Sequence, residues 1–431
     1  MESIWQKSVE LPTFPTLEND IKTDVLIVGG GLAGILTAYK FKEKGVDCIV
    51  VEKDRICQKV TANTTAKITS QHGFCYSKII KSNGFESAKM YLHANELALR
   101  EYEKLCKNIP CDFEKKDNFV YTLENMKLID DELEALWKMG FDAEFQDKLP
   151  LPIKPIGAIK FKNQAQFNVL RFVKGIVKDL KVYENTFVKK IDGTSAITEK
   201  SKITFKKAVI ATHFPIINNH GLFFMKMYQH RSYVIALENT PQIDGMYVDQ
   251  SDTGLSFRNY EKLLLLGGGS HKTGKDGGNW QELRDFAKLN YPNAKEVAFW
   301  ATQDCKSLDD IPYIGPYFKS SKNLFVITGF NKWGMTNAMA GAMILCDLIT
   351  EKANPYAKAF APSRSILKPQ LLVNGFESIK NLLTPTPKRC PHLGCALKWN
   401  KAEHTWDCPC HGSRFTENGK LLENPANGDL E

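Results

Sequence analysis

The chain has 431 residues, of which 43% are hydrophobic and 25% are charged, and its formal net charge is +8. This length is too great for one hydrophobic core and predicts two or three domains. No run reaches the roughly 18 apolar residues of a membrane span, and the N-terminal MESIWQKS lacks the pattern of a signal peptide. We therefore expect a cytoplasmic protein, with peripheral membrane association left open. The positive charge is dispersed, which indicates no nucleic-acid partner.

The first motif, at residues 24–54, has the pattern of a dinucleotide-binding unit. It predicts a buried strand at 25–28, a glycine turn with the pattern Gly29-x-Gly31-x-x-Gly34, a helix to about residue 44, and a second strand at 48–51. The glycines let backbone N–H groups approach a pyrophosphate at the start of the helix. Glu52 closes the second strand and can accept hydrogen bonds from an adenosine ribose. The motif alone does not separate FAD from NAD.

The middle of the chain mixes helical and strand patterns. We expect helices at about 86–108, 125–139 and 165–180, and a strand-rich substrate region at about 222–270. The linker at 351–389 is predicted to contain one amphipathic helix, around 371–383.

Two boxes of cysteine and histidine stand near the C-terminus. They read Cys390-Pro-His392-Leu-Gly-Cys395 and Cys408-Pro-Cys410-His411-Gly-Ser413. Zinc also takes two cysteines and two histidines, but usually as a cysteine pair followed by a histidine pair. Here each box supplies one of each, and the pattern resembles the Rieske family, which holds a [2Fe–2S] cluster on two thiolates and two imidazoles.

The Rieske resemblance implies a role for each of these residues. The cluster ligands would be Cys390, His392, Cys408 and His411, and Cys395 would form a disulfide with Cys410. The family's high-potential members carry a tyrosine two residues after the serine. Here that position is Phe415, so we expect a lower potential.

Three other segments resemble the amino-acid-oxidase-like (DAO) FAD oxidoreductases. They are TANTTAKITSQHG at 61–73, AVIATHFP at 208–215, and LFVITGFNKWGMT at 324–336, which leads into a helix to about residue 349. This resemblance implies FAD as the cofactor. Besides the glycine turn and Glu52, it places FAD contacts at Thr65, Val188, Thr212, Gly329, Gly334, Met335 and Thr336.

Together the resemblances imply an α/β (α+β) fold with a Rossmann-like FAD-binding domain, an antiparallel-sheet substrate domain and a small all-β Rieske domain. The predicted boundaries are 1–365 for the oxidoreductase domain, 366–385 for a helical linker and 386–431 for the Rieske domain. Within the first, the dinucleotide parts are about 20–85, 160–220 and 300–350, and the substrate parts about 86–160 and 221–299.

The substrate side is less defined by the sequence. In the amine-oxidising relatives a cation on the antiparallel sheet often holds the substrate carboxylate, and the resemblance makes Arg258 the first candidate for this role and Arg231 the second. A guanidinium fork also matches a carboxylate; a structural ion pair is the alternative for Arg258. His271 could face the flavin or be a structural histidine. Lys67, Lys332 and Trp333 lie in segments that could line the pocket.

We interpret the chain as an oxidoreductase in which FAD takes two electrons from a small substrate, an amine or amino acid. The electrons would leave singly through the cluster to an external acceptor, a carrier protein or a quinone. Two alternatives stay open: a reductase whose flavin is fed by the cluster, and an electron-transfer protein without a substrate of its own.

Overall fold

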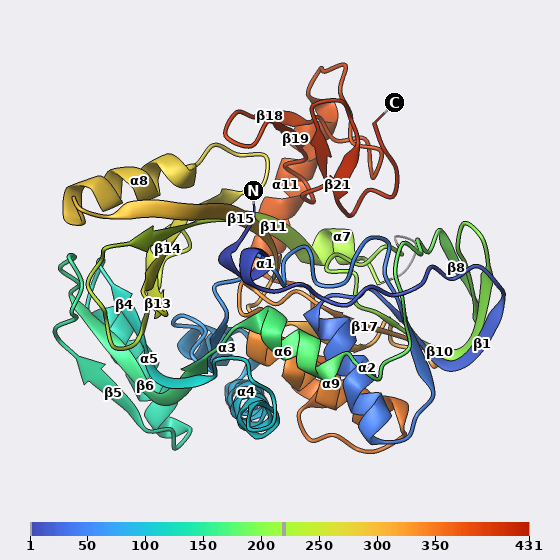
Figure 1. The fold of residues 1–431 in the computed structure, drawn as a ribbon, viewed down its shortest axis with the longest axis horizontal. Coiled ribbons are helices and arrows are strands. Elements are labelled where there is room, and N and C mark those ends of the chain that lie inside the picture. The colour runs from blue at the N-terminus through green and yellow to red at the C-terminus, as the bar shows by residue number, and fades with distance from the viewer. Residues whose placement is uncertain (1, 218–220, 431) are drawn as a thin grey trace.

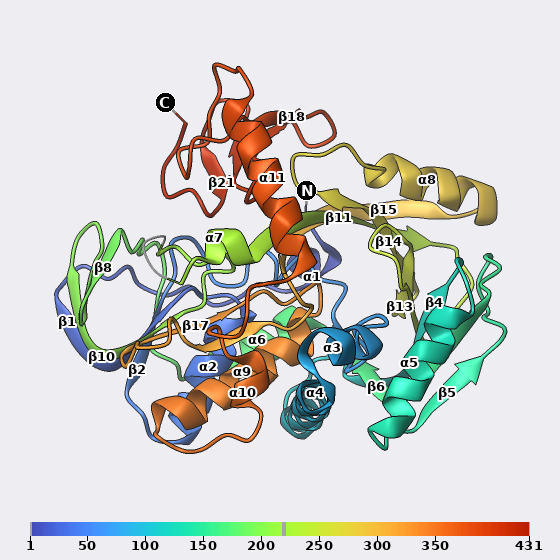
Figure 2. The ribbon, with the colours of Figure 1, turned by 180° about the vertical axis from the view of Figure 1, so that it is seen from behind.

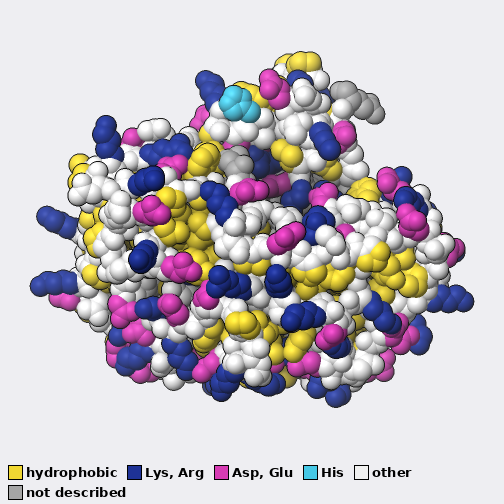
Figure 3. All heavy atoms as spheres, viewed as in Figure 1, with side chains coloured by type: hydrophobic (Ala, Val, Ile, Leu, Met, Phe, Trp, Pro, Cys, Tyr) yellow, Lys and Arg dark blue, Asp and Glu magenta, His cyan; other side chains and the backbone are white. Residues whose placement is uncertain are grey.

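Two large sheets and a small third sheet form the protein, whose structure is a computed structural model that describes residues 2–217 and 221–430 (Figure 1). The large sheets lie side by side in the body of the molecule, and the C-terminal unit lies on top of them in this view. Over the face drawn in Figure 3, lysines and arginines alternate with acidic side chains. Among the described residues, no helix is long and apolar enough to cross a membrane.

The first sheet contains the predicted dinucleotide unit. Its order is β16-β17-β10-β1-β2-β7, with β9 on β10 and β8 on β9, and β1 runs parallel to both β2 and β10. Helices α2 (Leu32–Glu43) and α9 (Gly334–Ile349) pack together against it. The strands are β1 (Ile21–Val28), β2 (Cys48–Val51), β7 (Val182–Tyr183), β8 (Lys190–Asp192), β9 (Ser195–Ile197), β10 (Lys202–Ile210), β16 (Tyr313–Pro316) and β17 (Leu324–Thr328).

The second sheet is mostly antiparallel, as predicted for the substrate region. Its order is β15-β11-β14-β13-β12-β4-β6-β3, with β5 on β6. Helix α8 (Asn279–Asn290) packs on β14 and β11. The strands are β3 (Lys67–Ile68), β4 (Glu114–Thr122), β5 (Ala143–Gln146), β6 (Gly157–Gln166), β11 (Met227–Glu238), β12 (Met246–Asp249), β13 (Ser256–Tyr260), β14 (Leu263–Lys272) and β15 (Lys295–Ser307).

Helices connect the two sheets, and two of them match the expectation within a few residues. These are α4 (Phe85–Cys106) and α5 (Lys127–Lys138). The helix expected at 165–180 is shorter, because residues up to Gln166 belong to β6 and the Asn168 side chain caps α6 (Val169–Ile176) by accepting from the Leu170 and Arg171 amides. The others are α1 (Ile4–Ser8), α3 (Tyr76–Asn83), α7 (Phe223–Lys226) and α10 (Ala357–Phe360).

Two predicted boundaries of the dinucleotide parts differ from the structure. Residues 160–166 continue β6 and residues 300–307 continue β15, and both strands lie in the second sheet. Apolar patterning identifies a strand, but hydrogen-bonded neighbours far along the chain decide which sheet the strand joins.

The chain ends in a helix and a four-stranded antiparallel sheet. Helix α11 (Pro369–Leu383) runs along the outside of the molecule from the body to this unit (Figure 2). The sheet order is β18-β19-β20-β21. The strands are β18 (Lys398–Asn400), β19 (Thr405–Asp407), β20 (Arg414–Thr416) and β21 (Leu421–Glu423).

Candidate functional site

A cavity of about 760 Å³ lies where the glycine turn meets the second sheet. Gly29 has φ +110°, and a Cβ there would lie 2.5 Å from the Ala211 carbonyl oxygen. A Cβ on Gly34 would lie 1.9 Å from the Gly29 carbonyl oxygen, so Gly34 keeps α2 close to β1. A Cβ on Gly31, by contrast, would meet no atom nearer than Thr61 Oγ1 at 3.7 Å, and it would point into space that the fold leaves open. This cradle fits a pyrophosphate.

Glu52 lines the same cavity. One carboxylate oxygen accepts from the Gly30 amide at 2.7 Å and the other from the Asp54 amide at 3.0 Å. Burial raises the pKa of Glu52, and the two amide donors oppose that rise. The carboxylate is thus held at the end of β2, where a ribose of the bound dinucleotide would lie.

Besides the glycine turn and Glu52, the structure brings most of the predicted FAD contacts to this cavity, although they come from four separate segments. Two predicted residues do not line it: Gly34 acts in packing, and the Thr336 hydroxyl donates to the Thr69 carbonyl at 2.8 Å. The predicted residues that line it are Gly29, Gly31, Glu52, Thr65, Val188, Thr212, Gly329, Gly334 and Met335.

Lys67 supplies a buried positive charge to the cavity. Its Nζ lies 3.3 Å from Thr65 Oγ1 and 3.5 Å from Ser256 Oγ, and among the described residues no carboxylate pairs with it. Burial, with a smaller contribution from the charge of Arg258, lowers the pKa of Lys67 to about 7. A cation in this state is stabilised by an anionic ligand. Lys332 and Trp333, the other two pocket candidates, also line the cavity.

Arg258 does not face the cavity, which corrects the first choice for a carboxylate ligand. Its side chain is fully buried, and its Nη1 donates to the carbonyl oxygens of Thr65 at 2.6 Å and Ala66 at 2.9 Å. It also packs over the rings of Trp5 and Tyr260. The guanidinium therefore holds the loop before Lys67 in place. Within residues 2–217 and 221–430, no carboxylate forms the ion pair considered as the alternative.

His271 also lies outside the cavity. Its Nε2 is 2.9 Å from the hydroxyl of Tyr233, its Nδ1 is 3.0 Å from the Lys272 carbonyl oxygen, and its ring stacks on Tyr233. Tyr233 in turn donates to Glu403 of the C-terminal unit. A structural role for His271 therefore fits, because both ring nitrogens have protein partners and one of these partners, Tyr233, contacts the C-terminal unit.

The two cysteine–histidine boxes come together at the end of the C-terminal unit nearest the body. The rings of His392 and His411 lie 5.0 Å apart, and the thiols of Cys390 and Cys408 are within hydrogen-bonding reach of each other, which lowers the pKa of Cys390. His411 is almost fully buried, and its ring has a hydrogen bond with the Phe224 backbone. Its Nδ1 has no hydrogen-bond partner in the part of the chain that the structure describes. A buried imidazole nitrogen left open this way fits a metal ligand whose other nitrogen is fixed by a carbonyl.

A disulfide joins the two boxes, between Cys395 and Cys410 as predicted. The sulfurs of Cys395, Cys408 and Cys410 all lie within 4.8 Å of one another. Since two of these form the disulfide, only Cys408 of the three remains as a thiolate ligand. The donor set is then two thiolates and two imidazoles, which fits the iron–sulfur cluster rather than a three-cysteine metal site.

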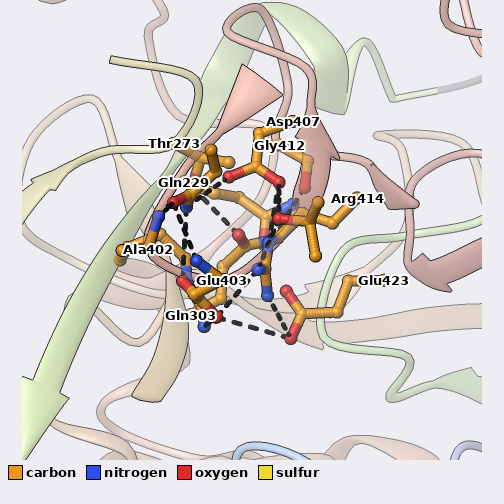
Figure 4. Close-up of polar contacts among 12 residues, drawn as sticks. Gln229, Thr273, Gln303, Ala402, Glu403, Asp407, Gly412, Arg414 and Glu423 are labelled. Carbon is orange, nitrogen blue, oxygen red and sulfur yellow. Dashed lines mark hydrogen bonds and ion pairs between the residues drawn. The ribbon is translucent and has the colours of Figure 1, made fainter. Parts of the chain in front are cut away.

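Arg231 fixes the C-terminal unit to the second sheet. Its Nε donates to Glu403 Oε1 at 2.9 Å, its Nη2 bonds the other oxygen, and both side chains are nearly inaccessible, at 2% and 3% exposure. Arg414 bonds the same carboxylate from within the C-terminal unit, at 2.8 Å, and Glu423 and Asp407 complete the group (Figure 4). The second-choice candidate for a substrate ligand is therefore part of an interdomain ion pair.

Two glutamines of the second sheet donate hydrogen bonds to the second cysteine–histidine box. Gln229 Nε2 donates to the carbonyl oxygens of His411 at 2.7 Å and Asn424 at 3.0 Å. Gln303 Nε2 donates to Gly412 at 2.7 Å and to Gln229 Oε1 at 2.8 Å (Figure 4). A Cβ on Gly412 would lie 2.6 Å from the Gln229 Cβ, so only glycine allows this approach.

The segment 212–214 touches both the cavity and the histidine pair. Thr212 and His213 line the cavity, and the ring of Phe214 lies edge-on to His392 at 6.3 Å and to His411 at 6.4 Å. The Asn424 side chain donates to the carbonyl oxygens of both Thr212 and Phe214 at 2.7 Å. The two predicted cofactor sites are thus adjacent, with the few residues of this segment between them.

The chain belongs to the FAD-dependent oxidoreductase family and carries a C-terminal Rieske domain. Residues 24–348 match the family described as FAD dependent oxidoreductase (DAO), and residues 371–431 match the Rieske [2Fe-2S] domain. Its cofactors are FAD and a [2Fe–2S] cluster, and the cavity and donor set described above fit both.

Similar proteins agree with this assignment. The chain is 35% identical to the putative Rieske 2Fe-2S iron-sulfur protein YhfW of Bacillus subtilis (strain 168), over 99% of this chain and 96% of that protein. Over 10% of the chain it is 50% identical to the cytochrome b6-f complex iron-sulfur subunit of Synechococcus sp. (strain JA-3-3Ab), of which 24% is covered.

Solved structures share the fold of the larger domain. Glycine oxidase from Geobacillus kaustophilus aligns with a TM-score of 0.67 and 18% identity, over 80% of this chain and 99% of that one. L-proline dehydrogenase from P. horikoshii aligns with a TM-score of 0.66 and 17% identity, over 81% and 98%. At these identities the likeness shows the fold alone.

Sequence reasoning did not find the residues that join the two domains. Gln229, Gln303, Glu403 and Arg414 belong to no motif, and only their distant partners give them a role. No short-range spacing in the sequence singles these residues out, because their partners across the junction lie far along the chain.

Proposed function

We propose that this oxidoreductase oxidises a small amine or amino acid and passes the electrons singly to an external acceptor, a carrier protein or a quinone. Bound FAD supplies two-electron chemistry and the cluster supplies one-electron transfer. The observation that carries the proposal is the position of the histidine pair, docked against Phe214 beside the cavity. The seven cysteines outside the disulfide and the cluster ligands are free and buried, which supports a cytoplasmic setting.

Buried contacts support transfer inside one chain. The Phe214 ring and the Gln229 and Asn424 amides fill the space between the domains, and His411 is 3% exposed. Water is therefore largely excluded from this side of the donor set. A buried junction of this kind favours electron transfer between adjacent sites without the movement of a tethered domain.

Lys67 supports a substrate that carries a carboxylate. It replaces Arg258 as the candidate anchor, because its ammonium group lines the cavity without an acidic partner among the described residues. An amino acid would bring that partner, whereas an amine without a carboxylate would leave the charge unpaired. This favours amino acids over simple amines.

The test is reduction of the bound flavin under anaerobic conditions by amino acids and their decarboxylated amines. We expect an amino acid to bleach the flavin faster than its matched amine. Lys67→Met should lower kcat/KM for the amino acid by about 10- to 150-fold, the value of a hydrogen bond to a charged group, and leave that for the amine nearly unchanged.

Lys226→Met is the matched control, since Lys226 is a buried lysine outside the cavity that donates to the Pro362 carbonyl. It should not alter the preference. Equal losses for amino acid and amine in Lys67→Met would contradict the anchoring role, and no bleaching by any substrate would contradict the proposed direction of electron flow.

A further inference from the structure

Helix α11 has an apolar side that faces solvent and a polar side that faces the protein. Leu372, Phe376 and Leu383 are 77%, 71% and 76% exposed, whereas Asn374 and Asn381 are each 6% exposed. A helix packed on a globular body normally buries its apolar side. The apolar stripe, defined here as Leu372, Val373, Phe376, Ile379, Leu382 and Leu383, therefore has no partner among the described residues.

Polar contacts fix the rotation of α11. Glu377 pairs with Lys272 and, at 3.0 Å, with Lys275 of the loop after β14. The Ala396 amide donates to the Asn381 carbonyl oxygen at 3.0 Å. Turning the apolar stripe inward would break this buried pairing, so its exposure is a property of the folded chain.

The stripe ends beside the cluster-binding loop. Arg389 donates from Nη1 to the carbonyl oxygens of Leu382 at 3.1 Å and Gly394 at 2.8 Å, which ties the last turn of α11 to the first box. Leu393, next to the ligand His392, is 42% exposed and extends the apolar surface. Figure 2 shows α11 along the outer side of the molecule, reaching up to the C-terminal unit.

The charges in the segment that carries the stripe are almost all positive. Residues 361–397 contain five basic side chains and one acidic side chain, and that acid, Glu377, points inward. The basic residues are Arg364, Lys368, Lys380, Lys388 and Arg389, of which the last three are exposed. An apolar stripe flanked by cations is the composition of helices that lie in the interface of an anionic membrane.

We propose that α11 binds the surface of an anionic lipid bilayer, with the apolar stripe in the headgroup region and Lys380, Lys388 and Arg389 against the phosphates. The helix lies flat on the membrane rather than crossing it. Binding this way brings the first cluster-binding box to the lipid surface. As a consequence that rests on the proposed function, the acceptor would be a lipid-soluble quinone rather than a carrier protein.

The test is flotation of the full-length holoprotein with vesicles of phosphatidylglycerol and phosphatidylcholine, and with vesicles of phosphatidylcholine alone. We expect binding to the mixed vesicles that weakens with added salt, and little binding to phosphatidylcholine alone. Leu372→Glu with Phe376→Glu should reduce partitioning by about a hundredfold, roughly tenfold for each apolar side chain withdrawn.

The matched control is Leu289→Glu, which changes a leucine that is 81% exposed and belongs to α8, a helix that both ribbon views draw apart from α11. It should float like the wild type. FAD content, cluster content and anaerobic flavin reduction should be unchanged in both variants, which separates failed membrane binding from a failure of the proposed function.

Three results would overturn the proposal. They are no flotation with anionic vesicles, equal flotation of the double variant, and an α11-dependent dimer in lipid-free sedimentation velocity, which would assign the apolar stripe to a second copy of the chain.

Discussion

Replacing Arg231 with methionine should loosen the Rieske domain from the second sheet. Burial by itself raises the pKa of Glu403, but the Arg231 and Arg414 guanidiniums lower it to about 2. Moving a carboxyl pKa from its ordinary 4.5 to about 2 corresponds to about 3 kcal/mol of favourable interaction with the charged form. Losing one partner of a buried pair costs a similar amount, about 3–5 kcal/mol.

The loss should fall on the docking of the domains, because Arg231 is the cation that the sheet contributes to this group. Without it, Arg414 faces Glu403, Asp407 and Glu423 alone. We expect about 3 kcal/mol less stability for the cluster-containing unit, and a urea midpoint lower by about 1 M or more.

The assay is urea unfolding of the holoprotein, followed by the circular dichroism of the cluster and separately by flavin fluorescence. The cluster signal should be lost earlier in Arg231→Met, while the flavin transition stays close to that of the wild type. Arg231→Lys keeps the positive charge but loses the guanidinium fork, so its cluster midpoint should fall between those of the wild type and Arg231→Met.

The pH dependence follows from the same carboxyl group. The folded-state pKa of Glu403 is depressed, so its contribution is present above about pH 4.5 and is lost as the pH falls toward about 2. Much of the stability that the wild type loses in acid through protonation of Glu403 should already be missing from Arg231→Met at neutral pH. An unchanged cluster midpoint in Arg231→Met would refute this account of the docking.

Three further predictions concern the cofactors and the cavity. The purified chain should carry about one FAD and two iron atoms, and zinc without acid-labile sulfide would contradict this. His411→Ala should lose the cluster's EPR signal and turnover with a one-electron acceptor, but keep FAD and substrate-driven flavin reduction. A cluster that is reduced before the flavin in stopped flow would contradict the proposed direction of electron flow. Phe415→Tyr should raise the cluster potential by tens of millivolts in voltammetry, because a hydroxyl at that buried position can donate to a ligand sulfur. An unchanged potential would mean that the side chain points elsewhere. Since the pKa of Lys67 is lowered to about 7, the charged form dominates below that pH, and kcat/KM for an amino acid should fall as the pH rises through about 7 in wild type but not in Lys67→Met.

The local motifs could be identified from the sequence because short-range spacing sets their chemistry. The glycines of 29–34 must adopt one tight turn wherever they occur after a strand, and Glu52 follows at the end of the next strand. The two cysteine–histidine boxes likewise carry their ligands within a few residues of each other. The periodicity of apolar residues was enough to predict α4 and α5 within a few residues, and the family resemblance predicted the helix that is α9.

Tertiary structure alone decided which charges face the cavity. Arg258 and Arg231 lie in the strand-rich region predicted at about 222–270, and His271 directly follows it. Strand pairing directs the first to a loop and the other two to the Rieske domain. Lys67 reaches the cavity because β3 pairs with β6, whose residues lie about a hundred positions further along the chain. For α11, periodicity predicted an apolar side, but only the pairing of Glu377 with Lys272 decided that this side faces outward. A sequence fixes which residues share a face, and the direction of that face depends on partners that only folding brings together.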